Sequence, residues 1–149
     1  MNIKILCIGK LKEKYWTGAV AEYTKRLSTY CKVEIVELKE NPKDDIEKEG
    51  ETLLSKINKD DYVVTLEIKG KGMTSEEFSK KIENLGIEGK STIVFVIGGS
   101  EGLSQAVMDR SNFAISFSKM TFPHQMIRVF LLEQIYRAYK IMKHEPYHK

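Results

Sequence analysis

Short runs of isoleucine and valine alternate with longer amphipathic stretches along the whole chain, and this alternation restricts the fold more than any other feature. Apolar runs of about five residues suit strands buried on both faces, whereas apolar residues at every third or fourth position suit helices that cover a sheet. Strands joined by crossover helices form a largely parallel sheet. The sequence therefore predicts an α/β protein.

The expected elements are five strands and five helices. The strands are residues 3–8, 33–38, 62–66, 92–97 and 114–117, and the helices are residues 15–27, 45–57, 75–85, 103–110 and 124–143. The start of the third helix is the clearest boundary, because Thr74 and Glu77 have the spacing of a capping box. That helix should begin after Gly70-Lys71-Gly72 and not within it.

The 149 residues, of which 42% are hydrophobic and 30% charged, suit one domain spanning residues 1–149. No apolar run approaches the roughly 20 residues that a membrane-spanning helix needs. The start, Met1 to Lys4, leads into a strand pattern and lacks the long apolar stretch of a signal peptide. We expect a soluble, cytoplasmic protein with no membrane partner.

Cysteines and histidines offer little for metal or thiol chemistry. Cys7 lies inside an apolar run, where a core role is favoured over a nucleophilic one. The tail from His144 to His148 has the HExxH spacing of zinc proteases, but Pro146 breaks the helix that would place both histidines on one face. We expect no metal, and instead an extended basic and aromatic tail that reaches into a site.

The charges are unevenly distributed. The net charge is only +3, but residues 119–149 carry six basic and two acidic side chains. A second basic cluster, formed by Lys10, Lys12 and Lys14, is followed directly by Tyr15 and Trp16. Positive charge beside aromatic rings is typical of RNA-binding surfaces, although a solvated loop has the same composition.

Two loops are candidates for ligand binding. The glycine-rich turn from Gly98 to Ser104 follows a buried strand, where α/β proteins often bind ligands, but it matches neither GxGxxG nor the Walker pattern. The loop from Phe117 to His124 could hold an adenine between Met120 and Phe122, or could be a packed connection.

The final helix has apolar residues on more than one stripe: Ile127, Phe130, Leu131, Leu132, Ile135, Tyr136, Tyr139 and Met142. A helix on one side of a sheet needs a single apolar face, so the surplus favours a partner subunit, with Phe130, Leu131 and Ile135 among its contacts. Deep burial within one chain is the alternative.

Taken together, five strings resemble one family over essentially the whole chain. They are Gly9-Lys10-Leu11-Lys12 with Tyr15-Trp16, Val64-Thr65-Leu66-Glu67, the run from Phe95 to Gly102, the run from Ser116 to His124, and Pro146-Tyr147-His148-Lys149. The family is that of the large-subunit ribosomal RNA pseudouridine N3-methyltransferases, of the SPOUT class.

The resemblance implies a trefoil-knotted domain that binds S-adenosylmethionine in the knot, and an antiparallel homodimer in which each site borrows the neighbour's tail. General topology rules argue against knots, so this expectation comes from the resemblance alone. The implied activity is methylation of N3 of a pseudouridine in 23S ribosomal RNA on the assembled ribosome. The connection at Asn41 to Asp44 is short for the family.

The implied cofactor-binding residues are Leu66, Gly98, Phe117, Ser118, Lys119, Met120, Thr121 and Phe122. In-line attack of a ring nitrogen on a sulfonium methyl group needs positioning and a base but no metal. We assign His148 to orienting or deprotonating the base, with Tyr147 beside it. Arg128 either holds a phosphate or the nucleobase, or forms a structural ion pair.

Two other functions are alternatives to a methyltransferase. A dinucleotide-dependent oxidoreductase is disfavoured, because only Gly9 and then lysines follow the first strand. A non-catalytic ribosome-binding or RNA-binding factor with the same fold is the main alternative to the enzyme.

Overall fold

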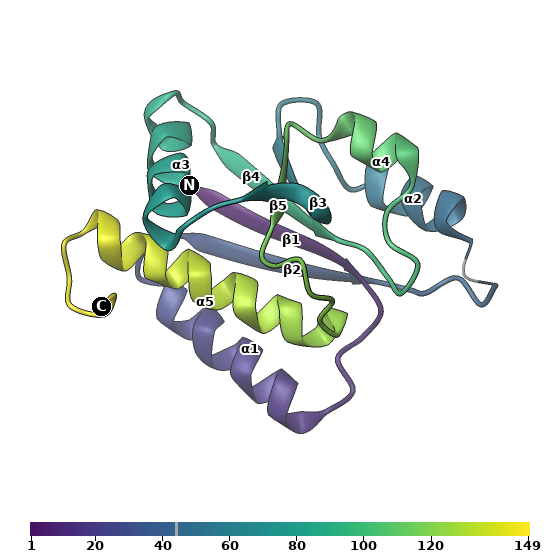
Figure 1. The fold of residues 1–149 in the computed structure, drawn as a ribbon, viewed down its shortest axis with the longest axis horizontal. Coiled ribbons are helices and arrows are strands. Elements are labelled where there is room, and N and C mark those ends of the chain that lie inside the picture. Colours follow the sequence, from purple (N-terminus) through teal and green to yellow (C-terminus); the bar gives the residue numbers. More distant parts are fainter. Residues whose placement is uncertain (44) are drawn as a thin grey trace.

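The computed structural model describes residues 1–43 and 45–149, so the short connection expected at 41–44 lies partly outside the described residues. Figure 1 shows the elements, which follow one another in the order β1 (Asn2–Ile8), α1 (Lys14–Leu27), β2 (Lys32–Leu38), α2 (Ile46–Leu54), β3 (Tyr62–Gly72), α3 (Ser75–Ile87), β4 (Thr92–Ile97), α4 (Gln105–Arg110), β5 (Phe113–Ser116) and α5 (His124–Met142).

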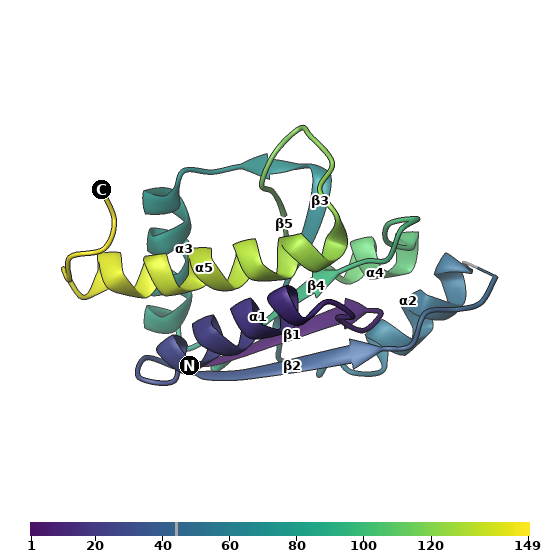
Figure 2. The ribbon, with the colours of Figure 1, turned by 90° about the horizontal axis from the view of Figure 1, so that it is seen from below.

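The strands form one five-stranded sheet in the order β2-β1-β4-β3-β5, and every neighbouring pair is parallel. Helices α1, α3 and α5 lie on one face of the sheet, and α2 and α4 lie on the other (Figures 1 and 2). The α/β class and the parallel sheet are therefore confirmed. The knot stays a prediction.

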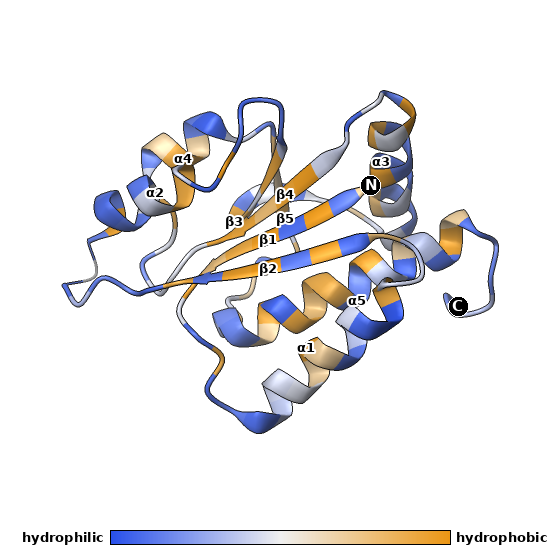
Figure 3. Ribbon diagram, turned by 180° about the vertical axis from the view of Figure 1, so that it is seen from behind, coloured by the Kyte–Doolittle hydropathy of each residue, from blue (hydrophilic) through white to orange (hydrophobic). Residues whose placement is uncertain are grey.

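Each face of the sheet has its own hydrophobic core, because successive side chains of a strand point to opposite faces. In β1, Ile3, Ile5 and Cys7 pack under α1, α3 and α5, while Leu6 and Ile8 pack under α2 and α4. The apolar strands between the two helical layers are visible in Figure 3. Burial raises the pKa of Cys7 to about 11, so its thiol is a neutral core group, as the sequence predicts.

Strand β3 is longer than expected, since it continues to Gly72 instead of ending at Leu66. Leu66 and Lys71 both pair with Ile115, so the four residues between them form a bulge. A side chain at Gly70 would place its Cβ only 2.7 Å from the carbonyl carbon of Ile115. Glycine there allows the bulged strand to return close to β5.

Helix α5 is buried mainly by its own chain. It packs against the sheet between α1 and α3 (Figure 2). Leu131 and Ile135 are 0% exposed, so our expectation that they contact a partner subunit is wrong. Deep burial accounts for most of the surplus apolar surface, and Phe130, at 37% exposure, is the residue of the expected three that stays accessible.

The chain reverses direction at the end of α5. His144, with φ of 55°, occupies the left-handed position of a Schellman turn, in which the amide of Glu145 donates to the carbonyl of Lys140 at 2.9 Å and that of His144 donates to Ile141 at 3.1 Å. The segment from His144 to His148 is not helical. The turn therefore directs the tail back along the helix.

Candidate active site

A cavity of about 820 Å³ lies beyond the carboxyl ends of β4 and β5, beside the bulge of β3. Ile97 closes its floor at the end of β4, and Ser116 lies at the end of β5. The volume is in the range of pockets that hold drug-sized ligands. Three segments form most of its wall: residues 66–69, 97–103 and 115–124.

The glycine-rich turn on one side of the cavity is closed by its own backbone. Gly99 and Gly102 form an isolated antiparallel bridge, and Gly102 has a φ of +86°. A Cβ at Gly98 would lie 2.7 Å from the carbonyl oxygen of Gly102. Gly98 therefore permits the tight turn itself, and the turn places backbone groups at the cavity wall.

The loop after β5 forms the opposite wall. The hydroxyl of Ser116 donates to the carbonyl of Ser118 at 2.9 Å, and the amide of Met120 donates to the hydroxyl of Ser118 at 2.9 Å. These bonds hold the loop in a curved shape. The side chain of Met120 is 73% exposed, which leaves it accessible at the mouth of the cavity.

His124, the first residue of α5, also lines the cavity. Burial lowers the pKa of His124, and the nearby positive charge of Arg128 lowers it further. The imidazole is therefore neutral near pH 7 and can accept a hydrogen bond. A neutral group at this point avoids repulsion of a positively charged ligand.

Glu67 brings a carboxylate to the wall near the β3 bulge. The hydroxyl of Thr65 donates to Glu67, and the same hydroxyl lies 2.8 Å from that of Ser111. Thr65 itself is fully buried. The Glu67 side chain is thus held in place by groups behind the cavity.

The cavity brings together most of the cofactor residues expected from the sequence. Leu66, Gly98, Phe117, Ser118, Met120, Thr121 and Phe122 all line it, whereas Lys119 is exposed and does not. The expected cofactor residues did not include Glu67, Ile68, His124 and Ile127, which also line the cavity. Glu67 and His124 lie within the strings that resemble the family, whereas Ile68 and Ile127 lie beside them, and the β3 bulge and the start of α5 that bring these residues to the cavity cannot be predicted from local patterns.

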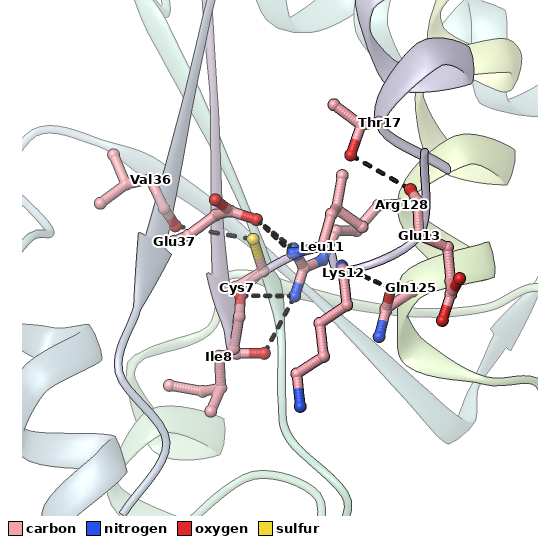
Figure 4. A network of polar contacts seen from close by, with 11 residues as sticks. Cys7, Ile8, Leu11, Lys12, Glu13, Thr17, Val36, Glu37, Gln125 and Arg128 are labelled. Carbon is pink, nitrogen blue, oxygen red and sulfur yellow. Dashed lines mark hydrogen bonds and ion pairs between the residues drawn. The ribbon is translucent and has the colours of Figure 1, made fainter. Parts of the chain in front are cut away.

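Arg128 is 2% exposed, and its buried side chain links α5 to the sheet (Figure 4). Its guanidinium donates to Glu37 at 2.8 Å and to the carbonyl oxygens of Ile8 and Gly9 at 3.0 and 2.8 Å. These contacts join the start of α5 to the ends of β1 and β2. The structural ion pair is therefore present, and a contact of Arg128 with substrate stays a prediction.

The tail packs on its own chain instead of extending away from it. The Tyr147 hydroxyl donates to Glu133 at 3.1 Å, and its ring meets Tyr136 with centroids 4.9 Å apart. His148 lies 2.6 Å from Glu76 through Nε2 and 3.0 Å from Arg137 through Nδ1.

In this position, the tail cannot serve the cavity of its own chain. Arg137, which contacts His148, lies about 20 Å along α5 from His124 at the cavity wall. Burial raises the pKa of Tyr147, so its phenol stays protonated and acts as a donor. The structure thus does not bring His148, Tyr147 and the cavity together within one chain.

The described residues contain neither a cluster of metal-binding side chains nor a membrane-spanning helix. Residues 1–43 and 45–149 contain no group of three or more His, Cys, Asp and Glu side chains suited to a metal ion. Within the same residues, no helix has the length and apolar character needed to cross a membrane.

Known proteins resemble this chain in sequence and in fold. Residues 1–148 match the family described as predicted SPOUT methyltransferase. The chain is 55% identical over 159 residues to ribosomal RNA large subunit methyltransferase H 1 of Clostridium perfringens, and 54% identical over 159 residues to ribosomal RNA large subunit methyltransferase H of Clostridium kluyveri. Both alignments cover 100% of this chain and of the relative.

Among solved structures, a probable methylase family protein from Haemophilus influenzae Rd KW20 is similar, with a TM-score of 0.56 and 12% sequence identity. The match covers 99% of this chain and 70% of that one. At this identity the likeness shows the fold alone.

Proposed function

Because this chain belongs to the SPOUT methyltransferase family, we propose that it transfers a methyl group from S-adenosylmethionine to N3 of a pseudouridine in 23S ribosomal RNA. It is a large-subunit ribosomal RNA methyltransferase, like the relatives that it matches at 55% identity over their full length. The cofactor, the modified atom and the homodimer are our proposals. The cavity supports the proposed cofactor, because seven of the eight expected cofactor residues line it.

The cavity suits S-adenosylmethionine in shape and chemistry. Its floor and sides are apolar where Leu66, Ile97 and Ile115 meet, which suits the flat adenine ring. The loop from Phe117 to Phe122 presents backbone groups that can read the edge of that ring. The carboxylate of Glu67 and the neutral His124 favour a ligand that carries positive charge.

The reaction then needs two things from the protein. When bound, the cofactor supplies a methyl group on a positively charged sulfur that leaves as a neutral thioether. The protein must hold the pseudouridine with N3 in line with the carbon–sulfur bond, and a base must take the N3 proton as the nitrogen–carbon bond forms. We propose that His148 accepts the N3 proton, and that Tyr147 positions the nucleobase by donating a hydrogen bond through its hydroxyl.

A homodimer resolves the separation between the tail and the cavity. The tail of one chain lies about 20 Å along α5 from its own cavity, so an antiparallel partner would have to supply the second half of the site. Accessible apolar groups lie beside the cavity: Met120 is 73% exposed and Phe130 is 37% exposed, with the Phe122 ring edge-on to Phe130 at 5.6 Å. These rings suit a subunit interface.

Calorimetric titration with S-adenosylmethionine tests the cofactor, with NAD as the control ligand. Tritium transfer to ribosomes from cells that lack the modification, followed by nucleoside mass spectrometry, tests the substrate and the modified atom. Failure to bind S-adenosylmethionine, together with retained RNA binding, would establish the non-catalytic alternative. Sedimentation equilibrium tests the dimer, and a species of 17.1 kDa at micromolar concentration contradicts it.

The proposed ribosomal RNA substrate also suggests where in the cell the protein acts. We propose that the protein works in the cytoplasm on the assembled ribosome. Incubation with free 23S RNA, isolated large subunits and whole ribosomes in parallel distinguishes these substrates, and methylation of free RNA at the ribosomal rate would contradict the proposal.

A further inference from the structure

The segment between β1 and the first turn of α1 carries a dense, exposed cluster of positive charge. Lys10, Lys12 and Lys14 are all exposed, and none of them forms an ion pair among the described residues. The acidic residue within the segment, Glu13, does not cap α1 through its side chain. The three ammonium groups are therefore available to an outside partner.

Helix stability does not explain Lys14, the one of the three lysines that lies in α1. The first turn of α1 has no acidic residue and begins with Lys14, although the positive end of a helix dipole favours acidic groups. Lysine at this point weakens the helix slightly. Such a departure from local preference is expected where a residue serves binding.

Two aromatic rings stand next to the charges. The side chain of Tyr15 is 65% exposed, and its ring meets that of Trp16 edge-on with centroids 4.9 Å apart. Trp16 is half-buried, and in the described part of the chain neither ring belongs to the two hydrophobic cores. Exposed rings beside lysines can stack on unpaired bases while the lysines neutralise phosphates.

The segment is fixed next to the mouth of the cavity. The amide of Lys12 donates to Gln125 at 3.3 Å, one residue after the cavity-lining His124 (Figure 4). The amide of Leu11 donates to Glu37 at 2.9 Å, and Glu37 is itself held by Arg128. A partner on these side chains would therefore lie within reach of a nucleotide that enters the cavity.

We propose that Lys10, Lys12, Lys14, Tyr15 and Trp16 form a docking surface for single-stranded or loop ribosomal RNA that flanks the target nucleotide. This assignment rests on the proposed function, which supplies the RNA substrate. The lysines contact phosphates and the rings stack on unpaired bases. The surface determines how tightly the substrate is held and leaves the methyl-transfer step and cofactor binding unchanged.

The test compares two triple variants of equal net charge. One carries Lys10→Gln, Lys12→Gln and Lys14→Gln. The control carries Lys32→Gln, Lys59→Gln and Lys90→Gln, which are exposed lysines at the opposite, amino-terminal edge of the sheet. Methyl transfer is measured on unmodified large ribosomal subunits, and salt-dependent binding is measured with a fluorescein-labelled 20-nucleotide single-stranded RNA.

We expect the first variant to raise KM for the subunits at least about tenfold, with kcat and the S-adenosylmethionine Kd unchanged. Its plot of log affinity for the labelled RNA against log salt should become shallower by about two, since each lost phosphate contact on a single strand removes about 0.7. The control should match the parent. Tyr15→Ala with Trp16→Ala should weaken RNA binding about fivefold or more without changing that slope.

An unchanged KM together with an unchanged salt slope would overturn the proposal. A raised KM with normal binding of the labelled RNA would also overturn it, because the surface would then contact a ribosomal protein. Failure of the proposed function looks different: the parent itself would then transfer no methyl group to any ribosomal RNA, while the labelled RNA would still test the docking surface.

Discussion

Replacing Arg128 with methionine distinguishes its two possible roles. In the structure, the guanidinium is 2% exposed and donates three hydrogen bonds, one to Glu37 and two to the carbonyl oxygens of Ile8 and Gly9. Methionine fills much of the volume but donates nothing. The two carbonyl groups then lose a charged partner at the end of β1, and Glu37 keeps its charge without a counterion.

The expected cost follows from these contacts. Removing one partner of a buried ion pair costs about 3–5 kcal/mol, and the cost lies at the low end when the remaining charge can reach water. The side chain of Glu37 is 32% exposed and can be hydrated. We therefore expect Arg128→Met to lower the free energy of unfolding by about 3 kcal/mol, which corresponds to a melting point lower by about 6 to 12 °C for a domain of this size.

Urea unfolding, followed by circular dichroism, measures this loss. Arg128→Lys should recover part of the stability, because an ammonium group can contact fewer of the three acceptors. Lys80→Met is the control, since Lys80 forms an exposed ion pair with Glu83 on α3 and should change stability little. A loss below about 1 kcal/mol for Arg128→Met, combined with a large fall in methyl transfer and normal cofactor binding, would refute the structural role.

Four further outcomes are expected. Gly98→Val should abolish S-adenosylmethionine binding in calorimetry and also lower the melting point, because its side chain would collide with the carbonyl of Gly102 and force the turn to shift; binding at parental affinity would show that the turn is not part of the site. Burial lowers the pKa of His124, so the unfolded chain binds more protons at this residue than the folded chain does. The contribution of His124 to the free energy of unfolding is therefore complete above about pH 6.5 and is lost as the pH drops below that value. His124→Gln should flatten that dependence in urea midpoints, and an unchanged profile would contradict the assignment. His144→Gly should raise stability by about 0.5 kcal/mol, since its φ of 55° is strained for histidine, and a loss of stability would mean that the side chain contributes more than the backbone. Deleting residues 146–149 should leave cofactor affinity nearly unchanged and reduce single-turnover methyl transfer about a hundredfold, with His148→Ala causing part of that loss; if His148→Ala retained the full rate, His148 would not be the base.

Local patterns were sufficient for the elements of this fold. The alternation of Ile/Val runs with amphipathic stretches located all five strands and all five helices, because burial on two faces requires it. The capping box at Thr74 and Glu77 placed the start of α3 correctly, since both of its hydrogen bonds form within three residues. The errors lie where distant segments meet, as in β3, whose extension depends on its pairing with β5.

In the candidate site, too, some features could be predicted from the sequence and others depend on the tertiary structure. The resemblance of short strings to one family indicated seven of the residues that line the cavity: Leu66 in β3, and six residues in two loops that are each continuous in sequence. The role of Arg128 could not be settled from the sequence, because its acceptors are about 90 to 120 positions away along the chain. Only the packing of α5 against the ends of β1 and β2 brings them together.

Sequence by itself determined the class of fold and the boundaries of most elements, because each depends on residues close together in the chain. Tertiary structure decided how α5 is covered, since Leu131 and Ile135 face helices and strands that no local pattern connects to them. It also decided where the tail lies, because the Schellman turn at His144 and the contacts of His148 with Glu76 and Arg137 join three separate segments. Contacts between distant segments depend on the packing of the whole domain, and the sequence near each residue does not contain that information.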